Sequence, residues 1–224
     1  MNNNCFKAFV LIVLAIFSTA TLSAQSLSSG QQSFVERRAA QKVGQMNNYI
    51  AYMVDEGYSS SDRKYYMQNA KNLFIGMAET YTEEGYSKIV NMQVTSVRNP
   101  TTPRTYPVKK YFESLIGLIE RGVYDNAKIN TTDITDMQVS HLRHLYDNVY
   151  ECTVAYVQLF CGYKDGRAYY CDRTKKNIKC RVYINPDGNG GYELEVSLSD
   201  CHATETKKIN SNQINNGGLL IPDR

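Results

Sequence analysis

Five cysteines in the C-terminal half of the chain are the residues whose spacing points most directly to chemistry: Cys152, Cys161, Cys171, Cys180 and Cys201. If two antiparallel strands turn at Gly166, Cys161 faces Cys171 across the pair. The same register places Cys152 opposite Cys180. The sequence therefore predicts two candidate disulfides, with buried free thiols as the alternative, and Cys201 is left over in either case.

The separation between the two cysteine pairs limits how both bridges could form. Nine residues separate Cys152 from Cys161, so an ideal strand points their side chains to opposite faces of the sheet. A β-bulge or a longer loop tip would be needed to suit both bridges. The spacing alone does not distinguish disulfide bridges from buried free thiols.

Histidine and cysteine also occur together in ways that suggest a metal site. Cys201 precedes His202, and His141 and His144 lie three residues apart. Zinc sites often take ligands from pairs such as Cys-x-x-Cys, which this chain lacks. A cysteine nucleophile paired with either histidine would need an activating feature such as a helix terminus beside the cysteine. The sequence shows no such feature. The sequence therefore predicts no metal, no cofactor and no catalytic residue.

Tyrosine is unusually frequent, with 18 residues in a chain that has no tryptophan. Five tyrosines lie on or near predicted core faces: Tyr66, Tyr81, Tyr111, Tyr150 and Tyr156. Tyrosine brings both an apolar ring and a hydroxyl, so it can line a binding pocket. We name Tyr111, Tyr150 and Tyr156 as candidate pocket residues; the alternative is that these rings fill core and interface.

A basic cluster precedes the end of the chain and consists of Arg173, Lys175, Lys176, Lys179 and Arg181. It could meet an anionic partner such as a polysaccharide or a membrane surface. However, a hairpin that pairs Ile184 with Tyr192 would set Arg181 opposite Glu195. Cross-strand ion pairing and protection of a sheet edge then explain these charges without a ligand.

The elements that must position these residues begin with helices. Apolar residues recur at spacings of three and four and predict a helix over 33–55. The run of serines and Asp62 that follows offers an N-cap for a second helix, whose apolar stripe extends to Tyr81. A strand is predicted over 90–97.

Three of the five prolines fall within 99–107, which predicts a rigid, non-helical connection. Pro107 is well suited to start a third helix, ending near Gly122. From there we predict strands over 124–133, 137–145, 149–161, 178–184 and 194–198. Helices followed by an antiparallel meander predict an α+β domain rather than alternating βαβ units.

This order of elements resembles the nuclear transport factor 2-like superfamily, the cystatin-like α+β roll. Three local stretches also look like exported bacterial domains of unknown function: 94–97, 106–112 and 160–167. The resemblance covers about residues 64–202. It implies N-terminal helices packed on a strongly curved antiparallel sheet, with a conical pocket between them, and it carries over no function.

The N-terminus reads as a secretory signal peptide over 1–24. A polar start that includes Lys7 precedes an apolar run over 8–17, and small residues follow up to Ala24. The apolar run is shorter than the roughly 20 residues of a membrane-spanning helix. We therefore expect an exported protein, periplasmic or secreted, with Cys5 removed and no transmembrane segment.

The rest of the chain divides into a flexible lead-in and N-terminal helix over 25–62, a roll domain over 63–202 and a loose tail over 203–224. Removing Lys7 with the signal leaves 24 basic residues against 22 acidic ones, which gives no argument for binding nucleic acid. The oligomeric state cannot be read from the sequence.

The leading functional hypothesis is a non-enzymatic binding module for a small molecule or an envelope protein. The alternative is a small pocket enzyme that uses tyrosine and carboxylate for acid–base chemistry, with Asp133, Asp136 and Glu151 as acids that no spacing singles out. A third hypothesis comes from 158–162, which approximates the inhibitory hairpin of cystatins.

Overall fold

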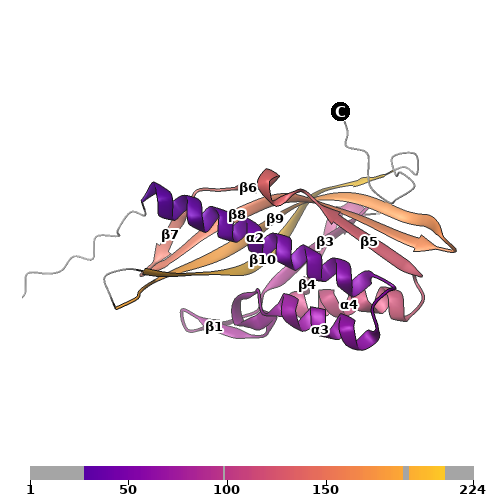
Figure 1. Cartoon of the computed structure of the whole chain (residues 1–224), viewed down its shortest axis with the longest axis horizontal. Helices are drawn as coiled ribbons and strands as arrows, with labels where there is room; N and C mark the ends of the chain where they lie inside the picture. The colour runs from indigo at the N-terminus through magenta and orange to yellow at the C-terminus, as the bar shows by residue number, and fades with distance from the viewer. Residues whose placement is uncertain (1–27, 98, 189–191, 210–224) are drawn as a thin grey trace, which may run out of the picture.

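The computed structural model of the chain describes residues 28–97, 99–188 and 192–209. Helices α2 (Ser29–Val54), α3 (Ser60–Lys71) and α4 (Val108–Glu120) lie against a large curved sheet. Figure 1 shows α2 running along the sheet, with α3 and α4 below it. The predicted α+β fold is confirmed. The predicted signal peptide and residues 210–224 of the predicted tail lie outside the described residues.

The main sheet is mixed rather than purely antiparallel. Its strand order is β4-β3-β10-β9-β8-β5. The strands are β3 (Asn91–Ser96), β4 (Asn99–Pro107), β5 (Asn126–Thr131), β8 (Val149–Lys164), β9 (Arg167–Pro186) and β10 (Tyr192–Lys208). Strand β10 returns beside β3 in a parallel sense, with Cys201 opposite Met92, so an all-antiparallel sheet is wrong at this one pair.

Shorter elements complete the described structure. Strands β6 (Gln138–Val139) and β7 (Arg143–Tyr146) both pair with β8 and are joined to β5 through the 3-10 helix η2 (Ile134–Asp136). Strands β1 (Tyr81–Glu83) and β2 (Tyr86–Lys88) form a separate hairpin. In the described residues, no helix is both long enough and apolar enough to cross a membrane.

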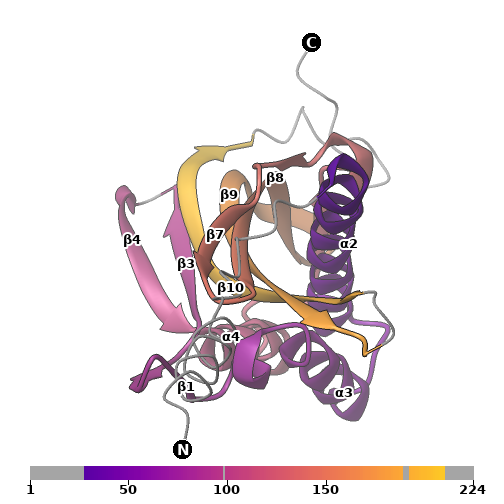
Figure 2. The ribbon, with the colours of Figure 1, turned by 90° about the vertical axis from the view of Figure 1, so that its left-hand side faces the viewer.

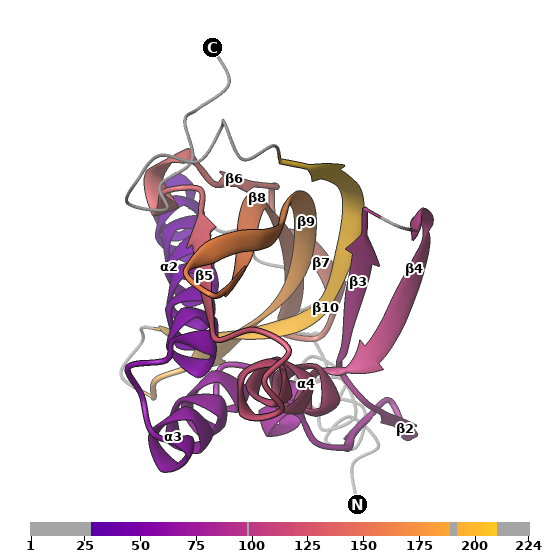
Figure 3. The same ribbon diagram turned by 90° about the vertical axis from the view of Figure 1, so that its right-hand side faces the viewer.

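The sheet curls because three long strands bend together. Figure 2 and Figure 3 show β8, β9 and β10 curving around the space that α2 and α4 face. Strand β10 carries register shifts between Leu198 and Cys201 and between Ala203 and Glu205. Such bulges bend a strand and increase its twist. The concave side, called here the inner face, packs against α2 and α4 and forms the core.

The helix boundaries follow local capping. Helix α2 begins earlier than the periodicity predicts, because Ser28 and Gln31 form a capping box. The predicted cap of α3 is confirmed, with Ser59 accepting a hydrogen bond from the backbone N–H of Asp62. The prediction that this helix continues to Tyr81 is wrong. Its apolar stripe breaks at the 3-10 helix η1 (Ile75–Ala78), where Gly76 adopts a φ of 59°.

The proline-rich segment forms the edge strand β4 rather than an unpaired connection. It pairs with β3 on one side only. Because proline lacks the N–H that a second neighbour would need, an edge strand accommodates it. The helix predicted after Pro107 is confirmed as α4, and Gly122 follows it with a φ of 65°.

Candidate functional site

The register of β8 and β9 sets the positions of four cysteines. Cys152 pairs with Cys180 and Cys161 pairs with Cys171, as the single predicted register requires. The strands turn at Asp165 and Gly166, both with positive φ. The β-bulge that two bridges would require is absent between the two cysteine pairs. Instead, the two pairs lie on opposite faces of the sheet.

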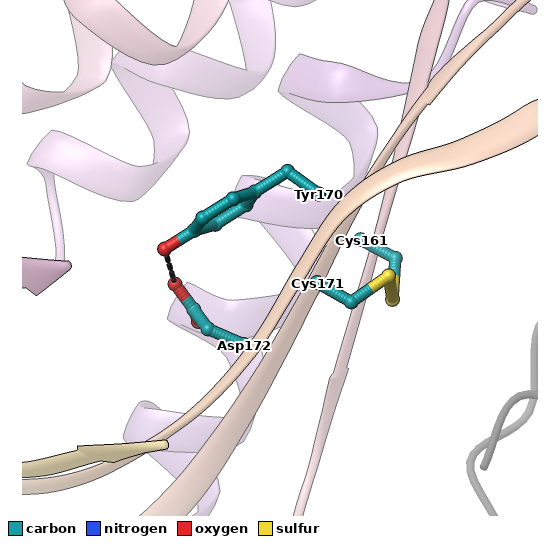
Figure 4. The surroundings of a disulfide bond; sticks show 4 residues. All are labelled: Cys161, Tyr170, Cys171 and Asp172. Atoms are coloured by element: carbon teal, nitrogen blue, oxygen red, sulfur yellow. Dashed lines mark hydrogen bonds between the residues drawn. A yellow bond between two sulfur atoms is a disulfide. The ribbon is translucent and has the colours of Figure 1, made fainter. Parts of the chain in front are cut away.

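The cysteine pair on the outer face forms a disulfide, and the pair on the inner face does not. Cys161 and Cys171 form a disulfide across a Cα–Cα distance of 4.2 Å. Figure 4 shows this bridge on the side of β9 opposite to Asp172. Cys152 and Cys180 are buried free thiols, in contrast to the second bridge named from the sequence. A hydrogen bond with Cys152, together with burial, raises the pKa of Cys180 well above its ordinary value.

We predict that alkylation of the unfolded, unreduced protein will label Cys152, Cys180 and Cys201, and that labelling of Cys161 and Cys171 will require prior reduction. Peptide mass spectrometry locates each label, so Cys5 is scored separately. The folded protein should resist labelling at all three free thiols because each is buried. Labelling of Cys161 without reduction, or a bridged Cys152–Cys180 peptide, would contradict this assignment.

The inner face of β9 changes from apolar to polar along the strand. Ile178, Cys180 and Val182 face the core, and alternation along the same strand places Lys176, Thr174 and Asp172 on that face. The three polar residues are only 4%, 5% and 9% exposed, respectively. Buried charged side chains are rare unless they are paired or serve a function. This stretch is therefore the strongest candidate for a site.

Neighbouring elements add further polar groups to this stretch. Tyr156 of β8 is the register partner of Lys176, and its hydroxyl lies 3.9 Å from the Sγ atom of Cys201 on β10. From α4, the ring of Tyr111 lies with its centroid 5.5 Å from the Lys176 Nζ atom. We call the following six residues the inner polar cluster: Tyr111, Tyr156, Asp172, Thr174, Lys176 and Cys201.

Asp172 is held by its own strand. The Tyr170 hydroxyl donates a hydrogen bond of 2.7 Å to the Asp172 Oδ2 atom, as Figure 4 shows, and Thr174 donates a longer one of 3.5 Å to Oδ1. Burial raises the pKa of Asp172 above its ordinary value, although the Tyr170 hydrogen bond and the charge of Lys176 oppose this shift. A buried carboxyl group with a raised pKa can bind a ligand or transfer a proton.

The tyrosine and cysteine side chains of the cluster stay neutral near pH 7. Burial raises the pKa of Tyr156 well above its ordinary value and also raises the pKa values of Tyr111 and Cys201. The charge of Lys176 acts on Tyr111 and Cys201 in the opposite direction. The cluster therefore presents protonated hydroxyl and thiol groups around one ammonium and one carboxyl group.

Two of the three predicted pocket tyrosines meet at this cluster. Tyr111 and Tyr156 both belong to it, but Tyr150 lies six residues before Tyr156 on β8, about 20 Å away along the strand. The ring of Tyr150 contacts the ring of His144 instead, with centroids 5.0 Å apart. The candidate acids Asp133 and Asp136 are exposed near η2.

Several tyrosines gather away from the cluster, where α2 meets α3. The ring of Tyr66 lies 4.8 Å from that of Tyr52, 5.0 Å from that of Tyr58 and 6.3 Å from that of Tyr49, between centroids. Stacked and edge-to-face contacts of this kind stabilise the helix pair. Part of the tyrosine excess is thus explained by helix packing.

The basic cluster of the sequence divides between the two faces of the sheet. On the outer side, Lys175 pairs with Glu205 at 2.6 Å and Lys179 approaches Glu151 at 3.8 Å. Glu151 also forms an ion pair with Arg143, with an N–O distance of 2.9 Å. Ion pairing therefore explains these charges as predicted, whereas Lys176 is buried on the inner face.

The prediction that Arg181 lies opposite Glu195 is wrong, because the pairing of β9 with β10 is shifted by two residues from the predicted register. Ile184 pairs with Leu194, which places Glu195 opposite Tyr183. Arg181 instead forms an ion pair of 3.1 Å with Glu83 of β1.

His141, His144 and the cystatin-like segment each contact neighbouring parts of the chain. His141 contacts Gln32 at 2.6 Å, and His144 contacts the backbone oxygen of Asp147 at 2.8 Å. Across the described ranges, no group of three or more His, Cys, Asp or Glu side chains could hold a metal ion. Gln158 lies inside β8, buried and bonded to Asn47 at 2.9 Å, rather than in an exposed inhibitory loop.

Sequence reasoning missed the polar part of the inner face. The signal was present: Lys176 lies two residues before Ile178, so it shares a face with Ile178 and Cys180 in any regular strand. Lys176 was instead grouped with the basic cluster, whose charges cross-strand ion pairing and edge protection were expected to explain. Asp172 was not singled out by any pattern.

Comparison with known proteins adds little to this geometry. No protein-family model and no curated protein matches the sequence. A solved structure of a Kribbella flavida protein is 11% identical, with a TM-score of 0.42 over 80% of this chain and 97% of that one. A Novosphingobium aromaticivorans protein, provisionally described as a scytalone dehydratase, is 10% identical, with a TM-score of 0.39 over 80% and 91%.

Proposed function

We propose that this chain is an exported binding module of the nuclear transport factor 2-like superfamily that holds a small molecule at its inner polar cluster. The observation that supports this proposal is the burial of Lys176, Asp172 and Tyr156 on the face of the sheet that otherwise forms the apolar core, where Tyr111 of α4 is buried as well. A few polar groups converging within apolar surroundings are typical of ligand sites.

Two observations support export. The sequence over 1–24 has the three-part pattern of a signal peptide. The disulfide between Cys161 and Cys171 fits an oxidising compartment, where such bonds persist. A periplasmic or secreted location is part of the proposal.

The acid–base enzyme is the second candidate function, and Asp172 favours it. Burial raises the pKa of this carboxyl group, as a general acid or base working near neutral pH requires. Against this function, both carboxylate oxygens already accept hydrogen bonds from Tyr170 and Thr174. Binding without turnover therefore accounts for the cluster more simply.

Native mass spectrometry of the protein recovered from its own cell envelope tests the proposal. We expect a mass above that of the mature polypeptide, falling to the polypeptide mass on denaturation. The exported protein should then return its released ligand unchanged after prolonged incubation. Conversion of that ligand by the wild-type protein, lost in Asp172→Asn, would establish the enzyme instead. A native mass equal to that of the polypeptide would contradict the binding function.

A further inference from the structure

Within the described residues, the ammonium group of Lys176 has no counter-ion. None of the ion pairs formed within the described residues includes it. It lies near the ring face of Tyr111 and also interacts with the side chain of that residue through a hydrogen bond, but neither contact supplies a negative charge. By contrast, the adjacent Lys175 is half exposed on the outer face and pairs with Glu205. A cation that is 96% buried with no ion pair in this part of the chain favours an anion from outside the described residues.

Asp172 does not supply that anion within ion-pair distance. It lies four residues from Lys176 on β9, with Thr174 between them on the same face, so their Cα atoms are about 13 Å apart. Its carboxylate is engaged with the hydroxyl groups of Tyr170 and Thr174. Its charge reaches Lys176 only at longer range.

We infer that the ligand of this site is a small organic monocarboxylate whose carboxylate group pairs with Lys176. This inference rests on the proposed binding function. A single ammonium group with no arginine in the cluster matches one negative charge, whereas a phosphate dianion would leave excess charge near Asp172. The rings of Tyr111 and Tyr156 suit an apolar or aromatic ligand body.

Calorimetric titration with matched acids and amides tests the inference. The probes are phenylacetate and octanoate, each compared with its own amide at equal ionic strength. We expect at least one acid to bind the wild-type protein at least tenfold more tightly than its amide. Lys176→Met should abolish that preference and Lys176→Arg should keep it, because the arginine retains the charge. Lys175→Met is the matched control and should bind like the wild type.

The outcomes separate this inference from the binding function itself. Equal binding of acid and amide, or acid binding unchanged in Lys176→Met, would overturn the carboxylate assignment while leaving a binding module. Recovery of an uncharged ligand by native mass spectrometry would do the same. A protein that binds no probe and retains no molecule from its envelope would overturn both proposals. Circular dichroism of each variant confirms that the comparison is made on folded protein.

Discussion

Replacing Glu83 with glutamine is expected to lower the free energy of unfolding by about 3 kcal/mol at pH 7, because breaking a buried ion pair leaves the other charge uncompensated. The Glu83 carboxylate accepts hydrogen bonds from Tyr146 and Lys88, each at 2.8 Å. It also pairs with Arg181 at 3.1 Å, and the side chains of Glu83 and Arg181 are 8% and 11% exposed. Urea denaturation monitored by circular dichroism measures the loss.

The difference in the free energy of unfolding between the wild type and Glu83→Gln should depend on pH. Burial raises the pKa of Glu83, but the hydrogen bonds from Lys88 and Tyr146 and the charge of Arg181 outweigh it, so the pKa lies below its ordinary value of 4.5. A carboxyl group with a lowered pKa stabilises the fold above pH 4.5, and this contribution is lost as pH falls through the folded-state pKa. The stabilities of the wild type and Glu83→Gln should therefore approach each other as pH falls below 4.5 and converge below the folded-state pKa of Glu83.

Glu84→Gln is the matched control for this prediction. Glu84 is the next residue, but its side chain is 58% exposed and it reaches Lys88 only at 3.8 Å. An exposed pair of this kind contributes little, so the control should stay within about 0.5 kcal/mol of the wild type. A Glu83→Gln variant as stable as this control at pH 7 would show that the network does not support the fold.

The ion pair between Glu83 and Arg181 could not be predicted from the sequence, whereas the β8–β9 register could. The β8–β9 register was predictable because both cysteine pairs share one register about Gly166, although a shift between Gly162 and Tyr163 separates them from the turn itself. Arg181 and Glu83 are 98 residues apart, and no local pattern connects a three-residue strand to the middle of β9. The β9–β10 register was missed because the length of the connecting loop does not by itself fix the pairing of the two strands.

The candidate site was partly predictable for a different reason. Tyr111 and Tyr156 lie among apolar residues with clear helix and strand periods, so their inward direction could be read from the sequence. Around Lys176 both faces of β9 are polar, and hydrophobic alternation no longer marks which face is inner. Only by extending the alternation back from Ile178 does Lys176 fall on the core side.

Replacing Lys176 with methionine is expected to raise the free energy of unfolding of the ligand-free protein by about 2 kcal/mol. Methionine keeps most of the apolar stem, which is buried, and removes a charge that has no ion-pair partner in the described chain. Substituting well-packed apolar residues for buried charges is often neutral or stabilising by about 1–4 kcal/mol. Urea denaturation after removal of bound molecules by unfolding and refolding measures the change.

The sign of this change separates a binding residue from a structural one. A lysine kept for the fold would make Lys176→Met less stable, because its contact with Tyr111 and its attraction to Asp172 would be lost. A lysine kept for an external carboxylate makes the empty protein less stable than it could be, which is the common trade-off between stability and function. Lys175→Met, on the outer face, should change stability by less than about 0.5 kcal/mol. A loss of more than about 1 kcal/mol in Lys176→Met would instead assign this lysine to the fold.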